Sequence, residues 1–344
     1  MTGPLRPTAG RVLRRTPLVV ALVLAGTTLA GCAAGGSSVP VVEAYVEPGD
    51  HALDRVTAAT ERARTIGIDG VTVTDDGSGV HALPDGVADL ARAAERGGAR
   101  SELLVSNFSE ALGDFSPEVG TAVLGDEAHR ERVARRLAAL AAEVRATGVQ
   151  IDLESLRARD RDGLVAFAAA LRSAVHEELG PDAEVSIAVM ASTSEEGYRA
   201  AGYDLRALTR SVDRFVLMTY DQHGSWSEPG TVGSLPWAGR VVRAAERAGL
   251  DAERIDLGIA GYGSVWASDG TGVPGQGDPE RARRLAGDAA VWSDATGEWS
   301  ARLDDGRELH WSDARSYRVR LALAGELGLH GVALWSLGTQ PLPD

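Results

Sequence analysis

Short apolar runs alternate with amphipathic stretches along most of this chain. Each run has four to seven mostly apolar residues, the length of a buried β-strand. The runs lie at residues 41–46, 70–73, 103–106, 149–153, 185–191, 215–220, 255–260 and 332–337. The pattern therefore predicts eight strands spread over nearly the whole sequence.

Helical periodicity fills the spaces between these runs. Apolar residues recur with a spacing near 3.6 in the segments 51–65, 86–96, 126–146, 160–179, 236–248 and 313–327. Eight strands alternating with helices are what a (β/α)8 TIM barrel requires. A doubly wound open sheet is the second interpretation, but no glycine-rich phosphate loop follows the first run.

One interval is much longer than the others, the one between the seventh and eighth runs. Within it, residues 290–311 have the pattern of short strands, with turn residues at 296–297 and 304–306. We therefore expect a small β-rich insertion at about residues 264–312, between barrel strands 7 and 8.

All seven tryptophans lie between Trp226 and Trp335, several of them in the predicted insertion. Tryptophan faces stack on sugar rings, but tryptophans also form the cores of small sheets. Either role is open for Trp292, Trp299 and Trp311.

The N-terminal 31 residues have the features of a signal peptide. Arginines are followed by a run of thirteen apolar or small residues at 18–30, which is too short to cross a bilayer as a stable helix. The tetrad Leu-Ala-Gly-Cys at 29–32 resembles the bacterial lipobox, in which the cysteine is lipidated and becomes the first mature residue. An ordinary secretory signal with a chance cysteine is the alternative.

This interpretation predicts an extracytoplasmic protein that is anchored to the cell membrane through a lipid on Cys32. Residues 32–39 would form a flexible tether, and residues 40–344 a single folded body. Cys32 is the only cysteine, so no disulfide can form within the chain.

The net charge restricts the possible partners. The formal charge is −14 and becomes −18 without residues 1–31, whose four arginines have no acidic counterpart. Such a body repels nucleic acid and is not attracted to anionic membranes or wall polymers. We expect a monomer that contacts the membrane only through its lipid.

Two carboxylates near the end of the fourth run carry the candidate chemistry. Asp152 and Glu154 stand two positions apart, so in a strand their side chains point to the same face. The carboxyl ends of the strands are where α/β barrels hold their active sites. Two carboxyls this close raise the pKa of one of them, which makes a general acid usable near neutral pH. The alternative is a strand that ends in a solvated acidic loop.

Aromatic and polar residues end two other runs. Tyr220 shares a strand face with Met218 and is followed by Asp221, while the eighth run carries Trp335 near its end. Two carboxyls, a phenol and an indole at one barrel mouth suit a pyranose ring better than a phosphate. The seven histidines are scattered without metal-ligand spacing, and we expect no metal and no cofactor.

These motifs resemble glycoside hydrolase family 18, whose signature is D-G-x-D-x-D-x-E on the fourth barrel strand. Residues 147–154 read Thr-Gly-Val-Gln-Ile-Asp-Leu-Glu, so the last Asp and the Glu are kept, while Thr147 and Gln150 replace the first two Asp residues. The resemblance runs from about residue 40 to 343 and is closest to the branch with spore cortex-lytic N-acetylglucosaminidases. Further matching segments are 106–108, 218–221, 229–237, 258–263 and 334–338.

The resemblance implies substrate-assisted, retaining hydrolysis of β-1,4 bonds beside N-acetylglucosamine, in peptidoglycan or chitin-like glycans. Glu154 would be the general acid, Asp152 would orient the substrate's acetamido group, and Tyr220 would donate a hydrogen bond to its oxygen. The expected substrate-binding residues are Trp335 as the floor beneath the sugar, Asp221, Tyr45, Gln150, Met218 and Asn107.

The Gln150 departure from the family signature affects the expected pH profile, and a binding protein is the alternative to an enzyme. Because Gln150 supplies hydrogen bonds without charge, we expect a pH profile that differs from that of the family. The alternative to an enzyme is a lectin-like barrel that binds glycans with little turnover. Retention of Glu154, Asp152 and Tyr220 together favours hydrolysis, because a pure binder has no need of an acid.

Overall fold

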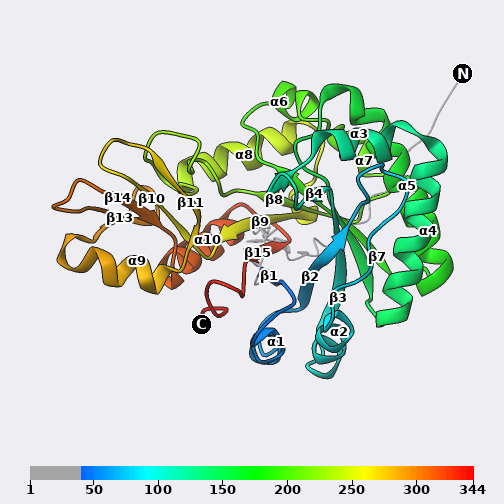
Figure 1. The fold of residues 1–344 in the computed structure, drawn as a ribbon, viewed down its shortest axis with the longest axis horizontal. Coiled ribbons are helices and arrows are strands. Elements are labelled where there is room, and N and C mark those ends of the chain that lie inside the picture. The colour runs from blue at the N-terminus through cyan, green and yellow to red at the C-terminus, as the bar shows by residue number, and fades with distance from the viewer. Residues whose placement is uncertain (1–39) are drawn as a thin grey trace, which may run out of the picture. The chain divides into compact units, whose positions relative to one another are not determined.

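Eight parallel strands close into a barrel in the order β1-β15-β9-β8-β7-β6-β3-β2 (Figure 1). This computed structural model describes residues 40–344, apart from the side chains of residues 274–276, so the expected signal peptide, the tether and Cys32 lie outside it. The predicted (β/α)8 fold is confirmed, and the open doubly wound sheet is excluded because the sheet closes on itself. The barrel strands are β1 (Val41–Val46), β2 (Thr65–Thr72), β3 (Arg100–Ser106), β6 (Gly148–Asp152), β7 (Glu184–Met190), β8 (Arg214–Met218), β9 (Ile255–Ala260) and β15 (Gly331–Trp335).

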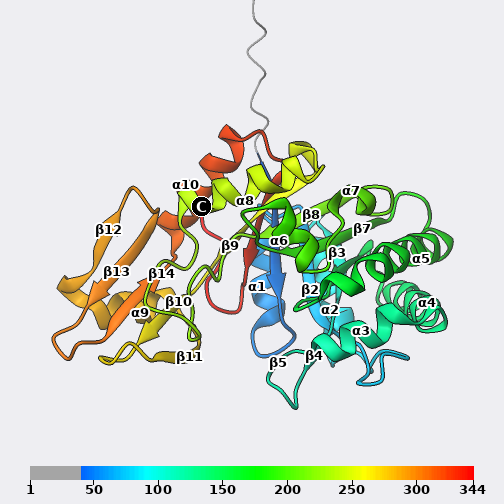
Figure 2. The ribbon, with the colours of Figure 1, turned by 90° about the horizontal axis from the view of Figure 1, so that it is seen from above.

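Helices surround the barrel (Figures 1 and 2). The helix-strand-helix unit predicted around the fourth strand is present, because α4 and α5 flank β6 in the chain and pack against each other. Helices on the outside bury the second face of each strand, which explains why the strands have nearly continuous apolar sequences. The helices are α1 (Ala52–Ala59), α2 (Val87–Arg96), α3 (Pro117–Gly125), α4 (Glu127–Val144), α5 (Arg161–Leu179), α6 (Glu195–Ala200), α7 (Leu205–Leu208), α8 (Leu235–Arg247) and α10 (Ala314–Glu326).

The second barrel strand begins earlier than predicted. The sequence pattern placed it at 70–73 after a helix reaching 65, whereas β2 covers Thr65–Thr72 and α1 ends at Ala59. Ile66 and Ile68 are fully buried, but a glycine between them interrupts the apolar pattern. That glycine, Gly67, is needed because a Cβ there would overlap the ring of Tyr45.

The predicted β-rich insertion between the seventh and eighth barrel strands is also present. Its turns fall where they were expected, at Gly297 and Gly306, both of which have a positive φ. Helix α9 (Pro279–Ala286) was not expected, because it buries only small residues on its apolar side and so lacks a visible apolar stripe. The five-stranded sheet has the order β11-β10-β14-β13-β12, with β10 (Gly263–Trp266), β11 (Gly272–Gly277), β12 (Val291–Ser293), β13 (Glu298–Arg302) and β14 (Glu308–Trp311).

The tryptophans of the insertion pack within it. Trp311 is fully buried and stacks on Trp299, with ring centroids 6.0 Å apart and planes at 8°. The guanidinium of Arg315 lies over the ring of Trp292 at 4.1 Å from its centroid. For Trp311 and Trp299 the structure therefore supports the core of the insertion, and the partly buried Trp292 packs edge-on against Trp299 at a centroid distance of 5.4 Å.

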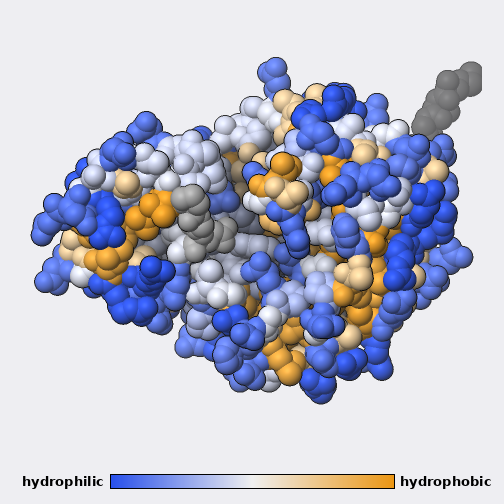
Figure 3. All heavy atoms as spheres, viewed as in Figure 1, coloured by the Kyte–Doolittle hydropathy of each residue, from blue (hydrophilic) through white to orange (hydrophobic). Residues whose placement is uncertain are grey.

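The described surface is mainly polar. On the face shown in Figure 3, hydrophilic residues predominate and apolar residues form separate groups. Within residues 40–344, no helix combines the length and the apolar character that crossing a membrane would need.

A buried ion pair joins the insertion to the barrel. Glu298 of β13 and Arg320 of α10 are almost completely buried and lie 2.6 Å apart. The Glu298 carboxylate also accepts hydrogen bonds from the backbone N–H groups of Val232 and Gly233, at 2.9 and 2.7 Å. Arg320 donates to the carbonyls of Gly233 and Gly297. The insertion, α10 and the loop after β8 are therefore fixed to one another through two charged side chains.

We predict that Glu298→Ala destabilises the protein by about 3–5 kcal/mol, because it leaves the Arg320 charge buried without its partner. Urea unfolding would measure the free-energy difference. Glu280→Ala is the control, since Glu280 forms an exposed i,i+4 pair with Arg284 and should cost at most about 0.5 kcal/mol. A loss below about 1 kcal/mol for Glu298→Ala would contradict this account.

Candidate active site

A cavity opens at the carboxyl ends of the barrel strands. Its volume is about 450 Å³, within the usual size range of small-ligand pockets. Eight of the candidate residues predicted from the sequence line it: Tyr45, Gln150, Asp152, Glu154, Met218, Tyr220, Asp221 and Trp335. The structure therefore brings together residues from four barrel strands and the loops that follow them.

Strand β6 supplies the two carboxyls. Its alternation directs Gln150 and Asp152 into the barrel, and the strand ends at Asp152. Asp152 is only 6% exposed, which excludes the alternative of a solvated acidic loop. Glu154 follows two residues later and is partly buried, and Ser155 then turns the chain with a positive φ of 55°.

Asn107 does not have the place that the sequence suggested. It was expected to contact the substrate, but it is fully buried and does not line the cavity. Its Nδ2 donates to the carbonyls of Ser116 and Glu154 at 2.8 and 2.9 Å, and its Oδ1 accepts from the N–H of Glu154 at 2.9 Å. Asn107 therefore holds the backbone of Glu154, and its amide is fully used in doing so.

Burial changes the acidity of both carboxyls. Burial raises the pKa of Asp152 to about 7, and the nearby charge of Asp69 adds to the effect. The pKa of Glu154 lies well above its usual range, first because of burial and then because of Asp152, Asp221 and Asp114. A protonated carboxyl is thus available near neutral pH. Asp69 was not predicted from the sequence, because it lies in β2 before the apolar run at 70–73 that was taken as the strand.

Tyr220 and Asp221 follow β8 at the mouth of the barrel. Gly258 makes room for Tyr220, because a Cβ there would lie 2.9 Å from the Tyr220 Cε1 atom. Asp221 has a left-handed backbone with φ of 56°, and its carboxylate accepts a 2.6 Å hydrogen bond from the hydroxyl of Tyr262. The Tyr262 ring also meets the Tyr220 ring edge-on, at a centroid distance of 6.2 Å. Both residues are therefore held in place by Tyr262.

Trp335 and Tyr45 form an aromatic floor. Trp335 ends β15 and is partly exposed to the cavity. Its ring packs on that of Tyr45, with centroids 5.4 Å apart, and the peptide bond after Trp335 is cis. The hydroxyl of Tyr45 donates to Gln150 Oε1 at 2.8 Å.

The sequence analysis did not identify several residues at the rim. Asp114 and Phe115 reach the cavity from a hairpin of two-residue strands, β4 (Phe108–Ser109) and β5 (Asp114–Phe115), which is too short to give a periodic signal. Trp226, which is 69% exposed, and Trp237 also line the cavity. Their position in the chain shortly after the predicted apolar run at 215–220 was the available signal.

The charge of the cavity limits its ligands. Four carboxyls line it, those of Asp114, Asp152, Glu154 and Asp221, and no arginine or histidine does so among the residues that the structure describes. Among the described side chains of residues 40–344, no group of three or more His, Cys, Asp or Glu is arranged to hold a metal ion. A lining with acids, phenols and indoles suits a neutral hydroxylated ligand and repels an anionic one.

The fold is shared with solved structures of glycan-degrading enzymes. The spore cortex-lytic enzyme SleL of Bacillus cereus superimposes with a TM-score of 0.75 and 19% identity, over 87% of this chain and 71% of that one. A chitinase from Chromobacterium violaceum gives a TM-score of 0.77 and 23% identity, over 89% and 95%. At these identities the comparison establishes the fold alone.

Sequence comparisons point to the same group. The chain is 28% identical over 234 residues to the cortical fragment-lytic enzyme of Bacillus subtilis, covering 65% of this chain and 54% of that protein. It is 26% identical over 226 residues to a probable endochitinase of Caenorhabditis elegans, covering 55% and 36%. The chain thus spans about half the length or less of these curated relatives. The profile of the Glycosyl hydrolases family 18 matches residues 97–340, and the chain belongs to that family.

Proposed function

We propose that the protein hydrolyses β-1,4 bonds of N-acetylglucosamine-containing glycans by a retaining, substrate-assisted mechanism at the cell envelope. The observation that carries the proposal is the meeting of Asp152, Glu154 and Tyr220 with the Trp335 ring in one cavity. Family membership and the relatives named cortical fragment-lytic enzyme and probable endochitinase support glycan hydrolysis. Peptidoglycan and chitin-like chains both fit this chemistry.

Glu154 acts as the general acid. It gives its proton to the glycosidic oxygen as the bond from that oxygen to the anomeric carbon breaks. The carbonyl oxygen of the substrate's own acetamido group forms the new bond to the anomeric carbon, giving an oxazolinium ion. Water then attacks the anomeric carbon, the bond from that carbon to the acetamido oxygen breaks and restores the acetamido group, and the Glu154 carboxylate takes up the proton that the water loses. The raised pKa of Glu154 supports this role, because it keeps more of the acid protonated as the pH rises.

Asp152 and Tyr220 act on the acetamido group. The Oδ1 atom of Asp152 is buried and has no hydrogen-bond partner among the described residues, so it can accept a hydrogen bond from the acetamido N–H. An ionised Asp152 also stabilises the positive charge that develops on the oxazolinium ion. Tyr220 lines the same cavity and donates to the acetamido oxygen. Trp335 supports the apolar face of the sugar.

We predict that Glu154→Gln lowers turnover of natural glycans by about 10²–10⁴-fold, because the amide keeps the shape of the side chain but cannot give up a proton. A nitrophenyl glycoside should be affected less, since its leaving group needs little protonation. Mass spectrometry of the products from peptidoglycan and from chitin oligomers would measure the first effect, and the release of nitrophenol would measure the second. Glu127→Gln, at the exposed start of α4, is the control. Full activity of Glu154→Gln would rule out the assigned acid.

A second prediction concerns pH. The kcat/KM value should fall on the alkaline side as Glu154 ionises and loses the proton that it must donate. Asp221→Asn removes one of the negative neighbours that raise the Glu154 pKa, so this decline should move to lower pH. A pH series of kcat/KM for the wild type and the variant tests the shift. A decline that stays in place or moves to higher pH would contradict the assignment.

We further propose that a lipid on Cys32 holds the protein at the outer side of the cell membrane. The lipobox-like tetrad at 29–32 and the short apolar run before it support this location. Cys32→Ala should release the protein into the soluble fraction, which cell fractionation and immunoblotting would detect. If this variant stays with the membranes through detergent-free washing, the anchor hypothesis is wrong.

A further inference from the structure

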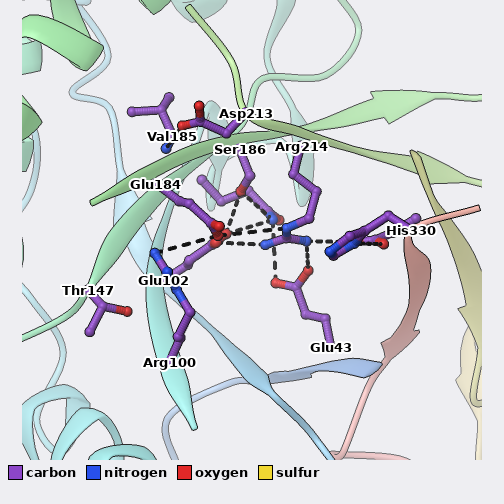
Figure 4. A network of polar contacts seen from close by, with 12 residues as sticks. Glu43, Arg100, Glu102, Thr147, Glu184, Val185, Ser186, Asp213, Arg214 and His330 are labelled. Atoms are coloured by element: carbon purple, nitrogen blue, oxygen red, sulfur yellow. Dashed lines mark hydrogen bonds and ion pairs between the residues drawn. The ribbon is translucent and has the colours of Figure 1, made fainter. Parts of the chain in front are cut away.

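A cluster of charged side chains fills the barrel interior near the amino ends of the strands (Figure 4). Arg214 of β8 lies at its centre and is 5% exposed. It donates to the carboxylates of Glu102 and Asp256, each at 2.6 Å, and to that of Glu43. These three carboxyls are at most 2% exposed. Burying four ionisable groups together is expensive compared with packing apolar side chains there, so the cluster calls for an explanation.

Gln150 connects this cluster to the cavity. Its Nε2 donates to Ser186 Oγ at 2.8 Å and to Glu102 at 3.2 Å, with Glu43 Oε1 at 3.4 Å. Because acceptors surround the NH2 group, the amide oxygen must point the other way, towards the cavity. That oxygen accepts the hydrogen bond from the hydroxyl of Tyr45. A flipped amide would set its oxygen against two carboxyls.

Tyr45 in turn supports Trp335. One side of the Tyr45 ring lies against Gly67, where any side chain would overlap it. The ring also contacts Trp335, at a centroid distance of 5.4 Å. The hydroxyl end is fixed by Gln150. The position of the Trp335 ring therefore depends on Tyr45, whose hydroxyl is in turn held by Gln150.

We propose that Gln150 and Arg214 are positioning residues, which hold Tyr45 and through it Trp335 at the place where the sugar ring binds. This inference rests on the proposed function. The Arg214 cluster sets the orientation of the Gln150 amide, and the amide sets the position of the Tyr45 hydroxyl. The family signature has Asp at the position of Gln150, and in this chain the neutral amide fits because its donors face Glu102 and Glu43.

Two members of the cluster have raised pKa values. Burial raises the pKa of Glu43 to about 8, so this carboxyl is mostly protonated at pH 7. His330 lies 2.7 Å from Asp256, and the hydrogen bond between them raises the pKa of His330. At the edge, Glu184 lies 3.9 Å from Arg214 and 3.6 Å from Arg100, so its charge is also paired.

A double-mutant cycle tests the proposal. Gln150→Met keeps the length of the side chain but cannot accept from Tyr45, and Tyr45→Phe removes the hydroxyl. Each single change should lower kcat/KM on a chitobiose nitrophenyl glycoside by about tenfold, the scale of one hydrogen bond. The kcat/KM value of the double variant should be no lower than that of the less active single variant, because both changes break the same Tyr45–Gln150 hydrogen bond. Effects that multiply would show that Gln150 does not act through Tyr45.

The cluster itself is tested by Arg214→Lys, which keeps the charge but cannot reach three carboxylates at once. It should lower kcat/KM in the wild-type background and have no further effect in the Tyr45→Phe background. Should Arg214→Lys not fold, Ser186→Ala replaces it, since this change removes the 2.8 Å acceptor of Gln150. Wild-type activity in the cluster variant that folds would overturn the proposal.

Tyr198→Phe is the matched control. It also removes a buried phenol hydroxyl, which donates to the carbonyl of Val241 at 3.3 Å, but Tyr198 does not line the cavity. It should lower the unfolding temperature without changing kcat/KM. If wild-type protein hydrolyses no glycan, the proposed function fails, and the crystal structure of Gln150→Met then decides the inference separately. Displaced Tyr45 and Trp335 rings are expected, and unmoved rings would overturn it.

Discussion

Closure of the barrel is the constraint on which this structure depends. In a closed parallel barrel every second residue of each strand must point inward, and the interior must be filled by these side chains. In β1 the inward residues include Glu43 and Tyr45, and in β6 they include Gln150 and Asp152. Strand β1 therefore contributes Glu43 to the charged cluster near the amino ends and Tyr45 to the cavity at the carboxyl ends. The active site therefore shares the barrel interior with a buried cluster of ionisable side chains.

The carboxyls at the two ends of this interior have different neighbours. Near the amino ends, Arg214 compensates the charges of Glu102 and Asp256 with direct hydrogen bonds. No arginine or histidine among the described residues lines the cavity, and there the pKa values of Asp152 and Glu154 rise. Burial raises carboxyl pKa values in both regions, since the pKa of Glu43 rises to about 8 even beside Arg214. In the cavity this effect favours a proton donor near neutral pH.

Much of the fold could be predicted from the sequence, because an apolar strand pattern and helical periodicity are local properties. The Asp152–Glu154 pair, Tyr220 and Trp335 could also be found, since each follows or ends a clear apolar run. Apart from those that begin at residues 41 and 255, the predicted strands began too late at their amino ends, however. Glu102, Glu184 and Arg214 lie within β3, β7 and β8 but were read as lying outside the apolar runs.

Glu102 and Arg214 are buried only because they pair across strands that are distant in the sequence. No local pattern reveals such pairing. The same limit explains why Asp69 was missed and why Asn107 was expected at the substrate. The side-chain amide of Asn107 forms hydrogen bonds with the backbone of Glu154, 47 residues further along the chain. Long-range hydrogen bonds, and not residue types, show which residues position others.

The stereochemistry of the first product tests the central claim most directly. If the substrate's acetamido oxygen attacks the anomeric carbon and water then replaces it from the opposite face, the configuration is inverted twice. Proton NMR of freshly formed product, recorded before mutarotation, should therefore show the β anomer. An initial α anomer would mean a single displacement by water, and it would contradict the roles given to Asp152, Glu154 and Tyr220 together.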